Sequence, residues 1–174
     1  VDALIEDQRA AAGDLPADFD PPAACIMAVH RTADGWHALR LGDCRLIAQA
    51  GNGLRRMVDF PNDDFDHALT VEATRLRAQG VTAISDIARR PGGYGVIEAD
   101  RACLAFAEYA RIDDPSAILI ASDGFYRIAD CYRAIDDHAL LAETAAPNGI
   151  AKLLAKMRGI ERADPDCRAY PRLK

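Results

Sequence analysis

The residues best suited to chemistry lie at positions 118–126, which read ILIASDGFY. The apolar start of this run predicts a strand that carries Asp123 at its C-terminal end. Gly124 follows and allows a sharp turn with close backbone approach. A carboxylate held there suits Mg²⁺ or Mn²⁺, because both ions prefer oxygen ligands. Ser-Asp-Gly is also typical of an ordinary turn, so a purely structural role stays open at this point.

A second carboxylate, Asp43, follows a predicted strand in the same way. It belongs to the segment LGDCRL at residues 41–46. Gly42 breaks the strand before it, and Cys44 and Arg45 lead into the next strand. Asp43 is therefore a second candidate metal ligand. The structural alternative is a corner in which Asp43 hydrogen-bonds to local backbone and Arg45 lies on a solvated face.

Taken together, the two segments resemble the type-2C metal-dependent Ser/Thr protein phosphatase family, in its bacterial form. The resemblance rests on Gly-Asp-Cys-Arg at residues 42–45 and on Ala-Ser-Asp-Gly-Phe-Tyr at residues 121–126. The segment RPGGYGV at residues 90–96 is similar to what bacterial members carry ahead of the second motif. The resemblance extends over about residues 20–160, and the order and spacing of the motifs carry more weight than either motif alone.

This resemblance implies an α+β fold, a four-layer α-β-β-α sandwich of two antiparallel sheets flanked by helices. It implies hydrolysis of phosphoserine and phosphothreonine in proteins by a water that two or three Mn²⁺ or Mg²⁺ ions activate. Asp123 would bind the metal centre directly, and Asp43 matches a position that helps to bind a third, weaker ion. Cys44 stands where the family usually has Ser, beside the Asp, and is not expected to act as a nucleophile.

The sequence departs from the family pattern at both ends. The upstream phosphate-binding Arg and the Asp-Gly-x-Gly segment would lie before Val1, and the closing Asp-(Asn/Asp)-x-Thr segment would follow Lys174. We therefore expect residues 1–174 to form a single phosphatase-like domain that is incomplete at both ends. The alternative is a catalytically degenerate domain of the same fold that binds a phosphoprotein or another partner. A third possibility is an unrelated α+β binding domain in which both Asp segments are turns.

The composition is that of a globular domain and argues against several classes of protein. The 174 residues include 27 acidic and 21 basic side chains, for a formal net charge of −6. Nucleic-acid binding needs a basic face, so no nucleic-acid partner is expected. No apolar run approaches the ~20 residues of a membrane span. Five cysteines without metal-site spacing, and no signal-peptide pattern, predict free thiols in a cytoplasmic protein. The phosphoprotein substrate is what the family resemblance implies.

Strands and helices are predicted in blocks, which favours an antiparallel sheet with packed helices. An N-terminal helix is predicted to end at Gly13. Four strands joined by short turns, one of them Asp34-Gly35, predict an antiparallel meander at residues 23–30, 36–41, 44–50 and 54–58. Further helices are predicted at residues 65–76, 82–89, 99–110 and 135–145, with a last one from residue 150 to Gly159.

Other polar and aromatic groups near these elements have simpler interpretations. Asp136 and Asp137 stand at a predicted helix start and are expected to cap it. The aromatic pair at residues 125–126 is expected to pack into the core. Arg89 and Arg90 are either a phosphate-recognition pair or a solvated helix end.

Overall fold

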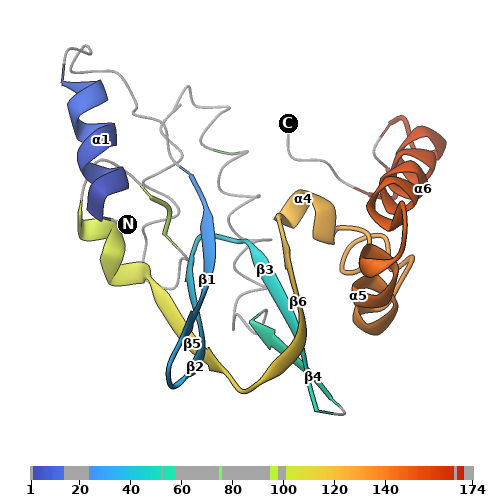
Figure 1. The fold of residues 1–174 in the computed structure, drawn as a ribbon. Helices are drawn as coiled ribbons and strands as arrows, with labels where there is room; N and C mark the ends of the chain where they lie inside the picture. The colour runs from blue at the N-terminus through green and yellow to red at the C-terminus, as the bar shows by residue number, and fades with distance from the viewer. Residues whose placement is uncertain are drawn as a thin grey trace. The chain divides into compact units, whose positions relative to one another are not determined.

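The computed structural model describes residues 2–13, 24–51, 53–57, 75, 95–97, 101–166 and 168–170. The chain divides into two units, one formed by Val1–Cys44 with Asp59–Arg111 and the other by Arg45–Val58 with Ile112–Lys174. Each unit has its own three-stranded antiparallel sheet, its own helical segments and its own apolar core (Figure 1). The α+β prediction is confirmed.

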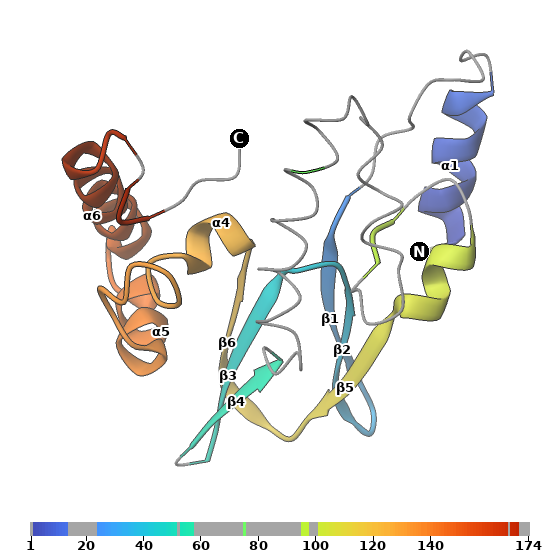
Figure 2. The same ribbon diagram turned by 180° about the vertical axis from the view of Figure 1, so that it is seen from behind.

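The first unit contains the sheet β1-β2-β5 and two helical segments among its described residues. Its elements are α1 (Asp2–Ala12), β1 (Ile26–Thr32), β2 (Gly35–Leu41), the 3-10 helix η1 (Arg101–Phe106) and β5 (Glu108–Ile112). Both views show η1 beside one end of α1 (Figures 1 and 2). The buried residues that join these elements are Ile5, Leu41, Ile97 and Cys103. As predicted, α1 ends at Gly13, whose N–H donates to the Ala10 carbonyl at 3.4 Å.

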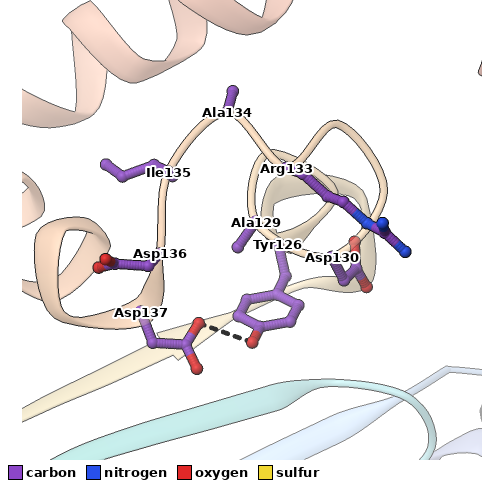
Figure 3. Close-up of a pocket in the computed structure, with 8 residues that line it drawn as sticks. All are labelled: Tyr126, Ala129, Asp130, Arg133, Ala134, Ile135, Asp136 and Asp137. Atoms are coloured by element: carbon purple, nitrogen blue, oxygen red, sulfur yellow. Dashed lines mark hydrogen bonds between the residues drawn. The ribbon is translucent and has the colours of Figure 1, made fainter.

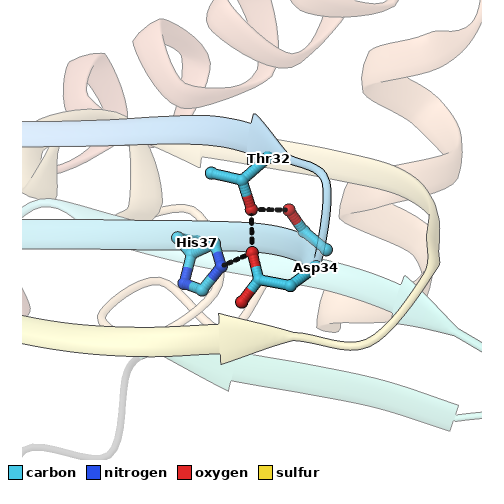
Figure 4. Close-up of polar contacts among 4 residues, drawn as sticks. Thr32, Asp34 and His37 are labelled. Atoms are coloured by element: carbon cyan, nitrogen blue, oxygen red, sulfur yellow. Dashed lines mark hydrogen bonds and ion pairs between the residues drawn. The ribbon is translucent and has the colours of Figure 1, made fainter.

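A local hydrogen-bond cluster holds the turn between β1 and β2 (Figure 4). The Thr32 hydroxyl donates to the Asp34 carboxylate, and its oxygen lies 3.1 Å from the Gly35 carbonyl oxygen. His37 Nε2 lies 3.2 Å from Asp34 Oδ1. The Thr32 hydrogen bond, supported by His37, lowers the pKa of Asp34. Gly35 has a φ of 130°, a conformation that a side chain disfavours, which explains why Asp-Gly predicts this hairpin.

The second unit contains the sheet β4-β3-β6 and, among its described residues, three helices. Its elements are β3 (Arg45–Ala50), β4 (Gly53–Met57), β6 (Pro115–Ala121), α4 (Asp123–Tyr126), α5 (Asp137–Ala145) and α6 (Gly149–Ala163). The central strand β3 pairs antiparallel with both neighbours, and Arg45 at its start lies opposite Ala121 at the end of β6. Both views show α5 and α6 side by side (Figures 1 and 2).

The predicted four-stranded meander is wrong. β1 with β2 and β3 with β4 form hairpins, but β2 and β3 are not neighbours. The other edge of β2 pairs with β5, and the other edge of β3 pairs with β6. The chain leaves β2 at Gly42, which has a φ of 105°. Local turn residues predict the hairpins, whereas the partner of each remaining edge comes from a distant part of the sequence.

Two helix predictions also need correction. Residues 99–110, predicted as a helix from their alanine content, include η1 and the start of β5. Burial alternates along β5, so sheet pairing overrides the local helix preference of alanine. The last helix does not end at Gly159 but continues to Ala163, because one exposed glycine weakens a helix without breaking it. The helices predicted at residues 65–76 and 82–89 lie outside the described residues except for Arg75, which is helical.

The core of the second unit lies between its sheet and its helices. The buried members come from β3, β6, α4 with the segment after it, α5 and α6: Ile47, Ala121, Tyr126, Ile128, Tyr132, Leu140, Leu153 and Met157. On α6, Leu153 and Met157 are one turn apart and form the buried stripe. Ile150 and Leu154, which the helical spacing places next to this stripe, are 54% and 41% exposed. The side of α6 next to the buried stripe therefore keeps apolar surface open to solvent.

A buried hydrogen bond joins α4 to the start of α5. The Tyr126 hydroxyl donates to Asp137 Oδ1 at 2.7 Å, and both residues are almost fully buried (Figure 3). Asp136 caps α5 as predicted, since its carboxylate accepts from the Ala139 N–H at 2.8 Å. Asp137 was predicted to cap the same helix, but its side chain is instead buried against Tyr126. The burial of Tyr126 confirms its predicted place in the core.

The buried pair gives a first stability prediction. We expect Tyr126→Phe to lower the free energy of unfolding by about 1.5–3 kcal/mol, because a buried carboxylate loses one hydrogen-bond donor. Urea denaturation followed by circular dichroism measures the change. Tyr109→Phe is the control, because Tyr109 is 74% exposed and its loss should change stability by less than about 0.5 kcal/mol. Equal stability of Tyr126→Phe and wild type would contradict the structural importance of this bond.

Two glycines of α6 give opposite predictions. A Cβ at Gly149 would overlap the backbone carbonyl oxygen of Glu143 in α5, whereas a Cβ at Gly159 meets no heavy atom within 4 Å. We expect Gly149→Ala to lower the free energy of unfolding by about 1–3 kcal/mol. Gly159→Ala should raise it by about 0.5–1 kcal/mol through better helix propensity. The same denaturation experiment checks both signs, and a neutral Gly149→Ala would show that the α5–α6 turn is looser than described.

Candidate functional site

Asp123 stands where β6 ends and the short helix α4 begins. The pairing of Arg45 with Ala121 fixes the end of β6 against β3. Ser122 then caps α4, since its side-chain oxygen accepts from the Phe125 N–H at 3.3 Å. Asp123 is exposed in the first turn of α4. The prediction that an apolar strand delivers Asp123 is confirmed, but the sharp turn predicted at Gly124 is wrong. Gly124 lies inside α4, and a Cβ there would meet only Ser122 Oγ at 3.9 Å.

The Asp123 carboxylate is available to a ligand. Among the described residues, no hydrogen-bond or ion-pair partner contacts this carboxylate. The Asp123 main chain, in contrast, is fixed, because its carbonyl oxygen accepts from the Arg127 N–H at 3.0 Å. A rigid backbone with an open carboxylate can accept hydrogen bonds or bind a hard cation. A single carboxylate ligand does not determine which metal ion binds.

A pocket of about 450 Å³ lies beside Asp123, entirely within the second unit. We call it the α4–α6 pocket. Its volume falls within the range of small-ligand sites, about 300–1,000 Å³. Leu154 and Met157 of α6 supply apolar lining. The other lining residues that matter for its chemistry are Asp123, Phe125, Arg127, Tyr132, Arg158 and Glu161.

A chain of polar contacts runs along the α4–α6 pocket. Arg127 lies over the Tyr132 ring, with its guanidinium carbon 5.3 Å from the ring centre, and its Nε donates to the Tyr132 hydroxyl oxygen at 3.5 Å. The Tyr132 hydroxyl donates to Glu161 Oε1 at 3.1 Å. Arg158 Nη1 donates to Glu161 Oε2 at 2.5 Å. Two guanidinium groups are therefore held along the pocket through one tyrosine and one carboxylate.

The two arginines are firmly charged. Burial is the largest single effect and opposes the charge of Arg127, but the hydrogen bond to Tyr132 and the nearby charges of Cys131, Tyr132 and Asp130 together outweigh it and raise the Arg127 pKa. The hydrogen bond and charge of Glu161 raise the pKa of Arg158. Sequence patterns did not predict this set of residues. The one signal was the i, i+3 spacing of Arg158 and Glu161, which is typical of an ion pair on one helix face.

Asp43 lies in the bend after β2 and interacts with a cysteine. The Cys25 side chain packs against Gly42, where a Cβ would overlap the sulfur atom. Cys25 is exposed as a residue, but desolvation of its thiol, then the hydrogen bond of the thiol to the Asp43 carboxylate, raise the pKa of Cys25 to about 12. The thiol therefore keeps its proton at neutral pH and serves as a donor to Asp43.

Asp43 and Asp123 belong to different units of the chain. In the parts of the chain that the structure describes, no three His, Cys, Asp or Glu side chains gather closely enough to hold a metal ion. Arg89 and Arg90, the predicted phosphate-recognition pair, lie outside the described residues. The predicted roles of both carboxylates in metal binding stay predictions.

A second pocket, of about 460 Å³, is bordered by α4, the segment after it and the start of α5 (Figure 3). It contains three acidic residues, Asp130, Asp136 and Asp137. Structure already accounts for two of them, since Asp136 caps α5 and Asp137 accepts from Tyr126. The pocket beside Asp123 is therefore the stronger candidate for a functional site.

Two further features concern the cysteines and the length of the helices. Four cysteines in the described part of the chain are free thiols: Cys25, Cys44, Cys103 and Cys131. None of the helices built by the described residues is long and apolar enough to cross a membrane.

The Cys25–Asp43 contact gives a prediction for thiol chemistry. In metal-free protein at pH 8, iodoacetamide should label Cys25 more slowly than an ordinary thiol, by roughly 10- to 100-fold. Asp43→Asn should speed the labelling, because removing the carboxylate lowers the Cys25 pKa. Peptide mass spectrometry measures the rate at each site. Cys131 is the internal control, since burial and not Asp43 raises its pKa. An equal rate of Cys25 labelling in wild type and in Asp43→Asn would contradict the Cys25–Asp43 contact.

The geometry can be set beside known proteins. Comparison with protein-family models, with curated proteins and with solved structures found no match.

Proposed function

We propose that this protein hydrolyses phosphoserine and phosphothreonine in other proteins with a water that Mn²⁺ or Mg²⁺ activates, and that Asp123 and Asp43 are each a metal ligand in their own unit. The observation that carries the proposal is the open Asp123 carboxylate beside a pocket that holds two arginines. Carboxylate oxygens suit a divalent cation, and guanidinium N–H groups match the oxygens of an anionic substrate. The resemblance of the two Asp motifs to type-2C phosphatases supports the same chemistry.

The residues present are compatible with a divalent cation. Asp123 offers an exposed carboxylate on a fixed backbone. Asp43 offers a second, whose partner is the neutral Cys25 thiol, a weak donor that a cation can displace. A bound divalent ion would supply a water of lowered pKa and would offset the charge that develops on the phosphate oxygens. The protein's own contribution in the pocket is to orient the phosphorylated segment through Arg127 and Arg158.

Three further expectations belong to this proposal. The two sheets form the inner layers of a four-layer α-β-β-α sandwich with helices outside. The free thiols fit the reducing cytoplasm. A formal net charge of −6 disfavours nucleic acid, which leaves a phosphoprotein as the partner.

A second candidate function is a domain that binds a phosphoprotein without hydrolysing it. The observation in its favour is that the Asp43 carboxylate already accepts a hydrogen bond from Cys25. A carboxylate engaged in this way can serve structure alone. In that case the arginines of the α4–α6 pocket would bind an anionic partner, and tight metal binding would be absent.

The proposed function predicts a metal-dependent activity that needs Asp123. The full chain should hydrolyse p-nitrophenyl phosphate in the presence of Mn²⁺, and EDTA should abolish the activity. Asp123→Ala should lower kcat/KM by at least about 100-fold, because it removes a direct metal ligand. Asp7→Asn, an exposed carboxylate on α1, is the matched control and should retain wild-type activity.

The outcomes separate the two candidate functions. Mn²⁺-dependent turnover that is lost in Asp123→Ala supports the phosphatase. Turnover that survives in a correctly folded Asp123→Ala protein contradicts the role given to Asp123. No turnover, together with no Mn²⁺ bound in equilibrium dialysis, would favour the binding domain.

A further inference from the structure

We propose that the α4–α6 pocket recognises acidic residues that flank the phosphorylated Ser or Thr of a protein substrate. The inference rests on the proposed function, because it takes the phosphate to be bound at Asp123, on the edge of this pocket. It assigns a specific ligand to the arginines on the wall formed by α6 and the segment after α4, which the proposed function uses to orient the phosphorylated segment. These residues would set which phosphoproteins are bound.

Arg158 is the main contact for an acidic side chain. Its side chain is 66% exposed, and its Nη1 donates to Glu161 at 2.5 Å. A guanidinium carries five N–H donors in a planar fork, so donors remain that face solvent. That fork matches the two oxygens of a carboxylate. Arg158 can therefore bind an acidic side chain while it keeps its ion pair with Glu161.

Arg127 adds a second positive charge in a fixed position. The Tyr132 ring lies under its guanidinium group, and the Tyr132 hydroxyl oxygen accepts a hydrogen bond from its Nε. Tyr132 is itself fixed, because it is buried in the core and donates to Glu161. A side chain that is already ordered loses little entropy on binding, which favours affinity. The pocket therefore presents its charge in a pre-organised form.

The wall formed by α6 and the segment after α4 favours an anionic ligand. Glu161 is the only carboxylate on this wall among the described lining residues, and its side chain is only 15% exposed. Tyr132 and Arg158 both donate to it, so the negative charge of Glu161 is largely balanced by these two hydrogen bonds. Two guanidinium groups against one such carboxylate leave this wall positive, and the other carboxylate that lines the pocket, Asp123, is the one that the proposed function assigns to a cation. Acidic residues would be attracted and basic residues repelled.

The apolar lining indicates a peptide and not a small inorganic anion. Leu154 is 41% exposed at the pocket, and Phe125 and Met157 also line it. Such surface gains free energy by covering the aliphatic parts of a peptide, which a free phosphate ion does not have. A volume of about 450 Å³ is sufficient for side chains next to the phosphorylated residue.

Two fluorescein-labelled phosphoserine peptides test this assignment. They share one sequence, except that the flanking positions carry Glu in the first peptide and Gln in the second. Fluorescence anisotropy with the full chain in Mn²⁺, using the non-hydrolysable phosphonate analogues of both peptides, measures binding without turnover. We expect the Glu peptide to bind about 5- to 10-fold more tightly than the Gln peptide. Arg158→Gln should abolish this preference, and Arg158→Lys should keep part of it.

Arg162→Gln is the matched control, because Arg162 is an exposed arginine of the same helix that does not line the pocket. It should keep the full preference for the Glu peptide. Equal binding of both peptides by the wild type, or a preference that survives in folded Arg158→Gln, would overturn the assignment. An Arg158-dependent preference without any Mn²⁺-dependent release of phosphate would support the pocket while the proposed phosphatase function fails.

Discussion

The pairing of β6 with β3 is the constraint on which the candidate site depends. Because Arg45 lies opposite Ala121, β6 ends where β3 begins, and Asp123 leaves the sheet at a fixed point. A slip of one residue would turn every side chain of β6 to the other face of the sheet. Leu119, which lies opposite Ile47 and packs against the core, would then leave it. The hydrophobic core of the second unit therefore sets the position of the carboxylate.

Two buried tyrosines in the segment that follows β6 have different structural roles. Tyr126 is buried and donates to the buried Asp137, so this pair links α4 to α5 and contributes to stability. Tyr132 is also buried, but its hydroxyl lies between Arg127 and Glu161 at the α4–α6 pocket. Tyr126 thus links two helices, whereas Tyr132 fixes the positions of charged side chains at the pocket. The stability of this segment and the geometry of the pocket are coupled through the shared core.

Sequence patterns predict the parts of this structure that depend on local chemistry. The Asp34-Gly35 turn, the strand that carries Asp123 and the cap at Asp136 follow from residue type and spacing alone. Sequence patterns do not predict which strand pairs with the remaining edge of each hairpin, because that pairing depends on segments that are distant in the sequence. The contact between Cys25 and Asp43 and the polar chain of the α4–α6 pocket are missed for the same reason.

The chemistry that we propose depends on side chains of opposite charge, a carboxylate for the cation and arginines for the anionic substrate. Asp123 is to hold a cation where it lines the pocket, and Arg127 and Arg158 are to hold the phosphorylated segment. The most direct test of this account is the release of inorganic phosphate from a phosphoserine protein such as casein by the full chain, with Mn²⁺ and with EDTA. The account predicts phosphate release that requires Mn²⁺. Release that is absent, or that is equal in EDTA, would contradict it.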